Sequence, residues 1–104
     1  MKIALDKIAA LAECIEGVDM AKVKRFRLAI RKGRPFKPIW LYPVNAAGFH
    51  VIDDGNHRAL AHLLEGKRHI DADIAPDRAA MGLSWRWPRV APLSMTLFLM
   101  RNGT

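Results

Sequence analysis

The sequence predicts an α+β fold, in which a small mixed sheet has helices packed against it. Short runs of aromatic and β-branched residues alternate along the chain with helix-prone, amphipathic segments, and both kinds of element need a shared core to bury their apolar sides. The length of 104 residues suits one folded domain. Apolar residues make up 51% of the chain and charged residues 26%, which is typical of globular proteins and not of disordered ones.

The first third of the chain is expected to contain one strand and two helices. Residues 1–8 alternate apolar and charged side chains, which predicts a short edge strand. Residues 9–15 are apolar and helix-prone and are predicted to form a helix. A longer helix should begin after Asp19, a good N-cap, and run to about Lys32, with Gly33 as its stop.

The middle of the chain predicts a hairpin, a helix and a strand. Residues 39–42 and 49–52 are rich in aromatic and β-branched side chains, and turn-forming residues separate them. After the glycine at position 55, residues 56–65 carry a leucine stripe that predicts a helix. Residues 69–74 then alternate apolar and polar side chains, as a half-buried strand does.

The last quarter of the chain has a looser pattern, which Pro88 and Pro92 interrupt and in which Trp85 and Trp87 flank Arg86. We therefore divide the chain into a domain of residues 1–75 and a C-terminal extension of residues 76–104. The extension either packs on the domain or forms an interface, and the sequence leaves both open. Its apolar residues 97–100 make a homodimer through this segment a candidate arrangement.

The formal net charge is +7, and the excess lies in one region, because no acidic residue occurs between Met20 and Ile52. Such a field attracts phosphates, either of a nucleic acid or of a nucleotide. The alternative is a solvated helix face that binds polyanions only weakly. In the helix predicted here, the apolar face comprises Met20, Val23, Phe26 and Ile30. The candidate nucleic-acid contacts are Lys22, Lys24, Arg25, Arg31, Lys32 and Arg34.

The segment Asp54-Gly55-Asn56-His57-Arg58 joins a predicted strand to a predicted helix. The start of a helix leaves several backbone N–H groups unpaired beside the positive end of the helix dipole, where a phosphate binds readily. Gly55 permits an unusual backbone conformation, and Arg58 is suited to a bidentate contact with phosphate oxygens. His57 would donate to a phosphate or move a proton. Gly55, Asn56, His57 and Arg58 are thus the candidate cofactor-binding residues.

Asp54 needs a different role, since a carboxylate repels an anion. It would cap the helix, act as a general base or bind a metal ion, so Asp54 and His57 are the candidate catalytic residues. The alternative is a polar corner without function, in which Asp54 caps the helix and pairs with Arg58. The density of polar side chains around one glycine favours the functional interpretation.

Three segments in this order resemble the ParB/sulfiredoxin superfamily: KIALDKI at residues 2–8, KPIWL at residues 37–41 and DGNHRA at residues 54–59. The resemblance covers roughly residues 1–75. It implies that the glycine turn holds nucleotide phosphates, as it does for CTP in ParB partition proteins and for ATP in sulfiredoxins. The implied cofactor is a nucleoside triphosphate or diphosphate, CTP or ATP/ADP, with or without Mg²⁺.

The resemblance also assigns roles to single residues. Gly55, His57 and Arg58 would contact the phosphates, and Asp54 would match the acidic residue of the related turn in free-serine kinases. Those kinases carry a glutamate after their first strand, and Glu13 or Glu16 lies in the corresponding region. Sulfiredoxins have their catalytic cysteine at the position that Asn56 occupies here, so sulfiredoxin activity is not expected.

The single cysteine, Cys14, excludes a disulfide within the chain, and a cytoplasmic location is expected. No apolar run approaches the roughly 18 residues of a membrane span, so no membrane partner is expected. The four histidines do not have the spacing of a zinc motif, and no metal site is predicted.

Three functions follow from these patterns. The first is a ParB-like nucleotide- or phosphate-binding domain associated with DNA. The second is a small phosphotransferase or nuclease that uses the Asp-Gly-Asn-His-Arg turn. The third is a non-catalytic protein-interaction module that keeps only the fold. The sequence alone leaves open whether the protein is an enzyme.

Overall fold

The computed structural model describes residues 1–76 and 90–96, and its strands form a six-stranded mixed sheet with the order β1-β5-β3-β4-β2-β6. The strands are β1 (Lys2–Ala4), β2 (Ile8–Leu11), β3 (Ile39–Leu41), β4 (His50–Asp54), β5 (His69–Ile74) and β6 (Val90–Pro92). The labelled helices are α1 (Ala12–Glu16), α2 (Met20–Arg31) and α3 (Asn56–Leu64), with a 3₁₀ turn at Leu5–Lys7 and a helical turn at residues 93–96. The β2–β4 and β3–β5 pairs are parallel, and the other pairs are antiparallel. The predicted α+β class with a small mixed sheet is confirmed.

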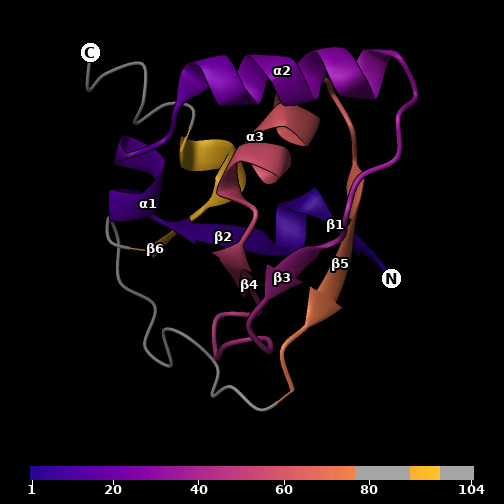
Figure 1. Ribbon diagram of the computed structural model, residues 1–104. Helices are drawn as coiled ribbons and strands as arrows, with labels where there is room; N and C mark the ends of the chain where they lie inside the picture. The colour runs from indigo at the N-terminus through magenta and orange to yellow at the C-terminus, as the bar shows by residue number, and fades with distance from the viewer. Residues whose placement is uncertain (77–89, 97–104) are drawn as a thin grey trace.

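The main core lies between the sheet and the two longer helices. Figure 1 shows α2 lying across the molecule, with α3 between it and the strands. The fully buried residues Ile8, Ile39 and Leu41 come from the strands, and Val23 and Leu60 come from α2 and α3. A smaller cluster contains Ala9, Val51 and Val90, with Leu11, Tyr42 and Phe49 packed against it. Since neighbouring residues of a strand point to opposite faces, this cluster lies on the other face of the sheet.

Most of the predicted elements are present at nearly the predicted residues. The side chain of Asp19 accepts a hydrogen bond from Ala21 N at 2.9 Å and caps α2 as expected. The hairpin of β3 and β4, helix α3 and strand β5 also agree with the sequence pattern. In α2, however, Met20 is 47% exposed, so the apolar face of this helix begins at Val23.

The prediction of a helix over residues 9–15 is wrong in its first half. Strand β2 occupies Ile8–Leu11 and lies between β4 and β6, and α1 begins only at Ala12. Ile8, Ala9 and Ala10 are buried on both sides of the sheet. A strand covered on both faces has a continuous apolar run, which its pattern alone does not distinguish from a buried helix. The first strand is an edge strand as predicted, but it ends at Ala4.

Part of the C-terminal region contributes to the sheet. Strand β6 pairs antiparallel with β2, with Ala91 opposite Ala10, and Leu93 and Thr96 are buried. Trp85, Trp87 and residues 97–100 lie outside the described residues, so a homodimer through this segment stays a prediction. Within the described part of the chain, none of the helices combines the length and the apolar character that crossing a bilayer requires.

Candidate functional site

Helix α3 begins at a glycine that the fold itself requires. Gly55 is the N-cap residue, with φ +118° in the left-handed region, which side chains rarely tolerate. A Cβ atom at this position would lie 2.7 Å from Cβ of Ile39 and closer still to its Cγ2. The end of β4 therefore passes tightly over β3, and Gly55 lets the chain turn there into α3.

The N-cap position of α3 is occupied by Gly55 and not by Asp54, the residue that the sequence had suggested. Because glycine has no side chain to accept a hydrogen bond, the N-cap residue leaves the backbone N–H groups of this turn at the positive end of the helix dipole, where an anion can bind. At the first residue of the helix, Asn56 Oδ1 is buried and has no hydrogen-bond partner in the described part of the chain.

Arg58 connects this turn to the segment that follows α2. Its Nη1 donates to the carbonyl oxygens of Lys37 at 2.8 Å and of Pro38 at 3.2 Å, and its Nη2 donates to Asp54 Oδ2 at 3.3 Å. The Arg58 side chain is only 16% exposed, whereas that of Asp54 is 72% exposed. We call residues 34–38 the strap, and Arg58 fastens its last two residues, Lys37 and Pro38, to the first turn of α3. The pairing of Asp54 with Arg58, which the sequence offered as the alternative without function, is present, and both terminal nitrogens of Arg58 donate within the protein.

His57 points to α2 and not into the open site. Its Nε2 accepts a hydrogen bond from the backbone N of Asp19 at 3.1 Å, which requires an unprotonated Nε2. Burial lowers the pKa of His57, and the nearby positive charge of Lys22 lowers it further, while Asp19 raises it. His57 therefore joins the start of α3 to the start of α2 as a neutral ring.

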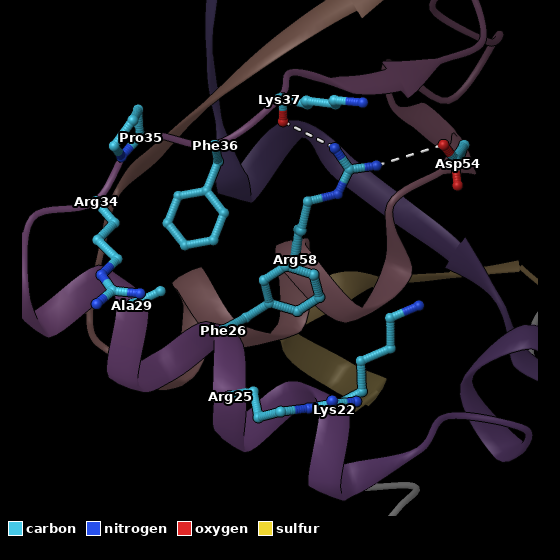
Figure 2. A pocket seen from close by; sticks show the side chains of 10 residues that line it. All are labelled: Lys22, Arg25, Phe26, Ala29, Arg34, Pro35, Phe36, Lys37, Asp54 and Arg58. Carbon is cyan, nitrogen blue, oxygen red and sulfur yellow. Dashed lines mark hydrogen bonds and ion pairs between the residues drawn. The ribbon is translucent and has the colours of Figure 1, made fainter.

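An open cleft of about 750 Å³ lies between α2, the strap and the turn at the start of α3. Figure 2 shows the cationic side chains around two phenylalanine rings. The rings of Phe26 and Phe36 have centroids 5.7 Å apart and are inclined at 49°. The lining residues are Lys22, Arg25, Phe26, Ala29, Arg34, Pro35, Phe36, Lys37, Asp54 and Arg58.

The structure divides the predicted basic residues into two groups. Lys22, Arg25 and Arg34 line the cleft together with Asp54 and Arg58 of the turn. Lys24, Arg31 and Lys32 do not line it. Sequence reasoning missed Lys37, Phe26 and Phe36 as site residues. A signal for two of them was available in the RPFKP motif at residues 34–38, which places an aromatic ring among cations and prolines.

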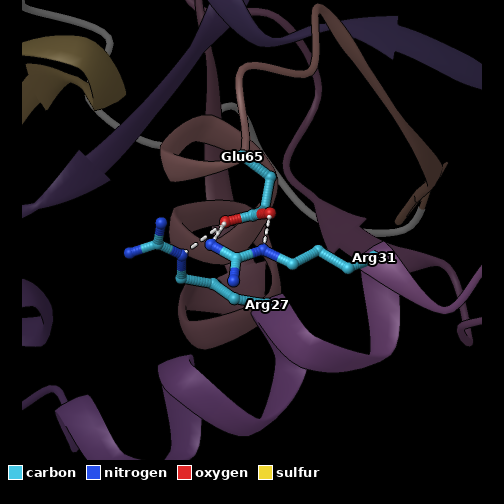
Figure 3. Close-up of polar contacts among 3 residues, drawn as sticks. All are labelled: Arg27, Arg31 and Glu65. Atoms are coloured by element: carbon cyan, nitrogen blue, oxygen red, sulfur yellow. Dashed lines mark hydrogen bonds and ion pairs between the residues drawn. The ribbon is translucent and has the colours of Figure 1, made fainter.

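Arg31 belongs to an ion-pair cluster whose residues do not line the cleft (Figure 3). Arg31 Nε donates to Glu65 Oε1 at 2.6 Å, and Arg27 Nε donates to Glu65 Oε2 at 2.6 Å. Hydrogen bonds from Arg31 and then Arg27 lower the pKa of Glu65 to about 2. The cluster joins the end of α2 to the end of α3, and Arg31 is thereby engaged within the protein.

The parallel pairing of β2 and β4 brings a glutamate to the same edge as the turn. Ile8 pairs with His50 and Ala9 with Val51, so the carboxyl ends of both strands lie side by side, where ligands of open α/β sheets usually bind. Helix α1, with Glu13 in its first turn, starts where β2 ends. No group of three or more potential metal ligands occurs among the described residues.

Comparison with known proteins identifies similar solved structures, although neither a family model nor a curated protein matches the chain. Sulfiredoxin from Arabidopsis thaliana is 28% identical with a TM-score of 0.61, and the match covers 71% of this chain and 81% of that one. Free serine kinase in complex with ADP is 23% identical with a TM-score of 0.63, over 73% of this chain. A conserved hypothetical protein from Pyrococcus furiosus is 21% identical with a TM-score of 0.61, over 71% of this chain. The chain spans 30% of the kinase and 31% of the Pyrococcus protein.

Proposed function

The chain has the ParB/sulfiredoxin-like fold, and on this basis we propose that it binds a nucleoside diphosphate or triphosphate in the cleft beside α3. One observation carries the proposal: five cationic side chains and two phenylalanines line an open cleft that meets the uncapped start of a helix. The complexes of free serine kinase with ADP and with AMP support the same class of ligand.

The charge of the cleft favours a polyphosphate over a single phosphate. Lys22, Arg25, Arg34, Lys37 and Arg58 face one carboxylate, that of Asp54, which leaves a surplus of four positive charges. A cleft of one sign concentrates ligands of the opposite sign. A diphosphate or triphosphate would spread several negative charges along these cations.

The proposed arrangement places the phosphates at the first turn of α3. Lys22, Lys37 and the backbone N–H groups of the turn would hold the phosphate oxygens. The rings of Phe26 and Phe36 would contact the base. Asp54, the exposed carboxylate at this end, would supply an oxygen to a Mg²⁺ ion that accompanies the phosphates. CTP and ATP or ADP are the ligands to compare first.

A pair of substitutions on α2 tests the proposal. Lys22→Gln removes a charge from the cleft, and Lys24→Gln removes an equal charge from an exposed position of the same helix outside the cleft. Thermal unfolding with CTP, ATP, ADP and GTP, with and without Mg²⁺, reports binding because a ligand of the native state raises the melting temperature. We expect a nucleotide to stabilise the wild type and Lys24→Gln, and to stabilise Lys22→Gln much less. If no nucleotide changes the melting temperature of the wild type, the proposal fails, and DNA binding or a protein-interaction module becomes the leading account.

A second candidate function is phosphoryl transfer or phosphodiester cleavage at the same turn. The observation that favours it is the parallel pairing of β2 with β4, which sets Glu13 at the same sheet edge as Asp54. Glu13 would act as the general base and Asp54 would hold a metal ion. Turnover should then disappear in both Glu13→Gln and Asp54→Asn while nucleotide binding persists. Turnover that survives both substitutions would exclude this chemistry.

Association with DNA is favoured by the basic residues that the cleft does not use. Lys24 and Lys32 are exposed and add positive charge to the surface of α2. If they contact DNA phosphates, the double variant Lys24→Gln/Lys32→Gln should lower the slope of log affinity against log salt by about two and leave nucleotide binding intact. An unchanged slope would show that Lys24 and Lys32 do not contact DNA phosphates.

A further inference from the structure

Resting on the proposed function, we infer that the cleft prefers nucleotides whose base presents hydrogen-bond acceptors, guanine above all, and that Arg34 is the residue that distinguishes the bases. The inference follows from the orientation of the cleft and from the kinds of side chain at each of its ends. It concerns the base and not the phosphates, so it can fail while the proposed function stands.

The phosphate end of the cleft lies at the start of α2. The hydrogen bond from Asp19 N to His57 Nε2 brings the first turns of α2 and α3 together, and Lys22 is close enough to His57 to lower its pKa. Asp54 and Arg58 join the cleft from the same turn. A phosphate bound to the start of α3 is therefore bound beside Lys22.

The other end of the cleft lies at the end of α2. Ala29 is seven residues beyond Lys22 along the helix, which corresponds to about 10 Å at the rise of an α-helix. The backbone N of Arg34 donates to the carbonyl oxygen of Ala29 at 3.0 Å. Arg34 thus lies at the end away from the phosphates, as Figure 2 also shows.

The space between the two ends suits a flat aromatic group. Phe26 of α2 and Phe36 of the strap lie between Lys22 and Arg34 in the cleft. The small side chain of Ala29 leaves room beside the rings. Stacking on aromatic side chains stabilises any base, because every base has a π-face. The phenylalanines therefore give affinity for a base without selecting one.

Discrimination between bases has to come from polar groups, and the polar side chains that line the cleft at the Arg34 end are hydrogen-bond donors. Arginine and lysine side chains carry no hydrogen-bond acceptor. The one carboxylate of the lining, Asp54, lies at the phosphate end and accepts from Arg58. The carbonyl oxygens of Lys37 and Pro38 also accept from Arg58. Among the described side chains that line the cleft, the polar groups at this end are therefore donors, which match a base edge that consists of acceptors.

Guanine meets this requirement best, because its O6 and N7 atoms accept both N–H groups of one arginine fork. Adenine and cytosine present an amino group at the corresponding position, which would face the guanidinium donor to donor. Arg34 has no carboxylate partner among residues 1–76 and 90–96, and its side chain is exposed. It is therefore free of any ion pair that would compete with a base.

Calorimetric titration of the wild type with GTP, ITP, ATP and CTP tests the inference. ITP keeps O6 and N7 but lacks the 2-amino group of guanine, so it isolates the edge that Arg34 would contact. We expect GTP and ITP to bind about fivefold or more tightly than ATP and CTP, which corresponds to the low end of the discrimination of an arginine–guanine contact. Equal or tighter binding of ATP or CTP would overturn the inference.

Variants of Arg34 separate charge from hydrogen-bond geometry. Arg34→Lys keeps the charge but loses the planar fork, so the preference for GTP should disappear while the affinity for ATP is retained. Arg34→Met should weaken all four nucleotides, and the control Lys32→Met, an exposed change outside the cleft, should alter neither affinity nor preference. A preference for GTP that persists in Arg34→Lys contradicts the assignment to Arg34. If none of the nucleotides binds the wild type, the proposed function itself fails.

Discussion

His57 Nε2 accepts a hydrogen bond from the backbone N of Asp19 at 3.1 Å, across 38 residues of sequence. The contact joins the first turns of α2 and α3, which form two sides of the cleft. It exists only while Nε2 carries no proton, and burial holds the pKa of His57 below its ordinary value of 6.5. The relative position of the two helices is therefore linked to the protonation of one ring.

Acidification should destabilise the protein through His57. Because the folded state lowers the pKa of His57, the unfolded state binds the proton more readily. The stabilising contribution of His57 is therefore fully present above pH 6.5, and it is lost as the pH falls through the pKa that His57 has in the folded protein. Urea unfolding at about pH 7.5 and about pH 5.5 measures the loss. His57→Gln keeps an acceptor but does not titrate, so its stability should fall less over this interval. An equal fall in both proteins would contradict the prediction.

Glu65 should contribute to stability at a lower pH. Its pKa falls from 4.5 to about 2 in the folded protein, so its contribution is present above 4.5 and is lost as the pH falls toward 2. Glu65→Gln should be less stable than the wild type at neutral pH, and the difference should shrink as the solution is acidified through this window. A difference that stays constant with pH would show that the ion pairs with Arg27 and Arg31 do not stabilise the fold.

Gly55→Ala should destabilise the protein by about 2 to 4 kcal/mol, because the strain of an alanine in the left-handed backbone region and the collision of its Cβ atom with Ile39 both cost free energy. Gly48→Ala is the matched control, since Gly48 also has a positive φ, of +86°, but an added Cβ there meets nothing within 4 Å. Gly48→Ala should cost only about 1 kcal/mol, from backbone strain alone. Chemical denaturation of both variants isolates the collision, and equal losses would show that the contact with β3 has no effect.

Arg58→Ala should weaken both the fold and nucleotide binding. The substitution leaves the carbonyl oxygens of Lys37 and Pro38 without the donor that fastens the strap, at a cost of about 2 kcal/mol. Arg25→Ala is the control, because Arg25 lines the same cleft from an exposed position on α2. It should lower nucleotide affinity and leave the free energy of unfolding nearly unchanged. If Arg58→Ala unfolds at the same denaturant concentration as the wild type, Arg58 does not hold the strap.

The fold was largely predictable where each element has its own local signal. The alternation of residues 69–74 and the glycine after β4 identify their elements without tertiary information. Strand β2 was not predictable, because Ala9 and Ala10 are buried on opposite faces of the sheet and leave no alternation to detect. Strand β6 has three residues and ends at Pro92, which is too short for a periodic signal.

One contact within the turn was predictable, but the residues that line the cleft were not. Asp54 and Arg58 are four residues apart on one corner, and their pairing, which the sequence offered as the alternative without function, is present. Phe26 has the helical spacing of Val23 and Ile30, so a periodic pattern assigns it to the core, although it lies at the border of core and cleft. The contacts of His57 with Asp19 and of Arg31 with Glu65 join residues more than 30 positions apart, and only the packing of α2 on α3 brings them together.

Helix α2 is fastened to α3 at both ends, by His57 at the start and by Glu65 at the end. Two fixed points on a pair of neighbouring helices oppose both hinge opening and sliding between them. The strap is fastened as well, by Arg58 at Lys37 and Pro38 and by the ring of Phe36, which packs against Phe26 and His62. Each side of the cleft is therefore held by contacts within the protein, and we expect the cleft to keep nearly the same shape when a ligand binds.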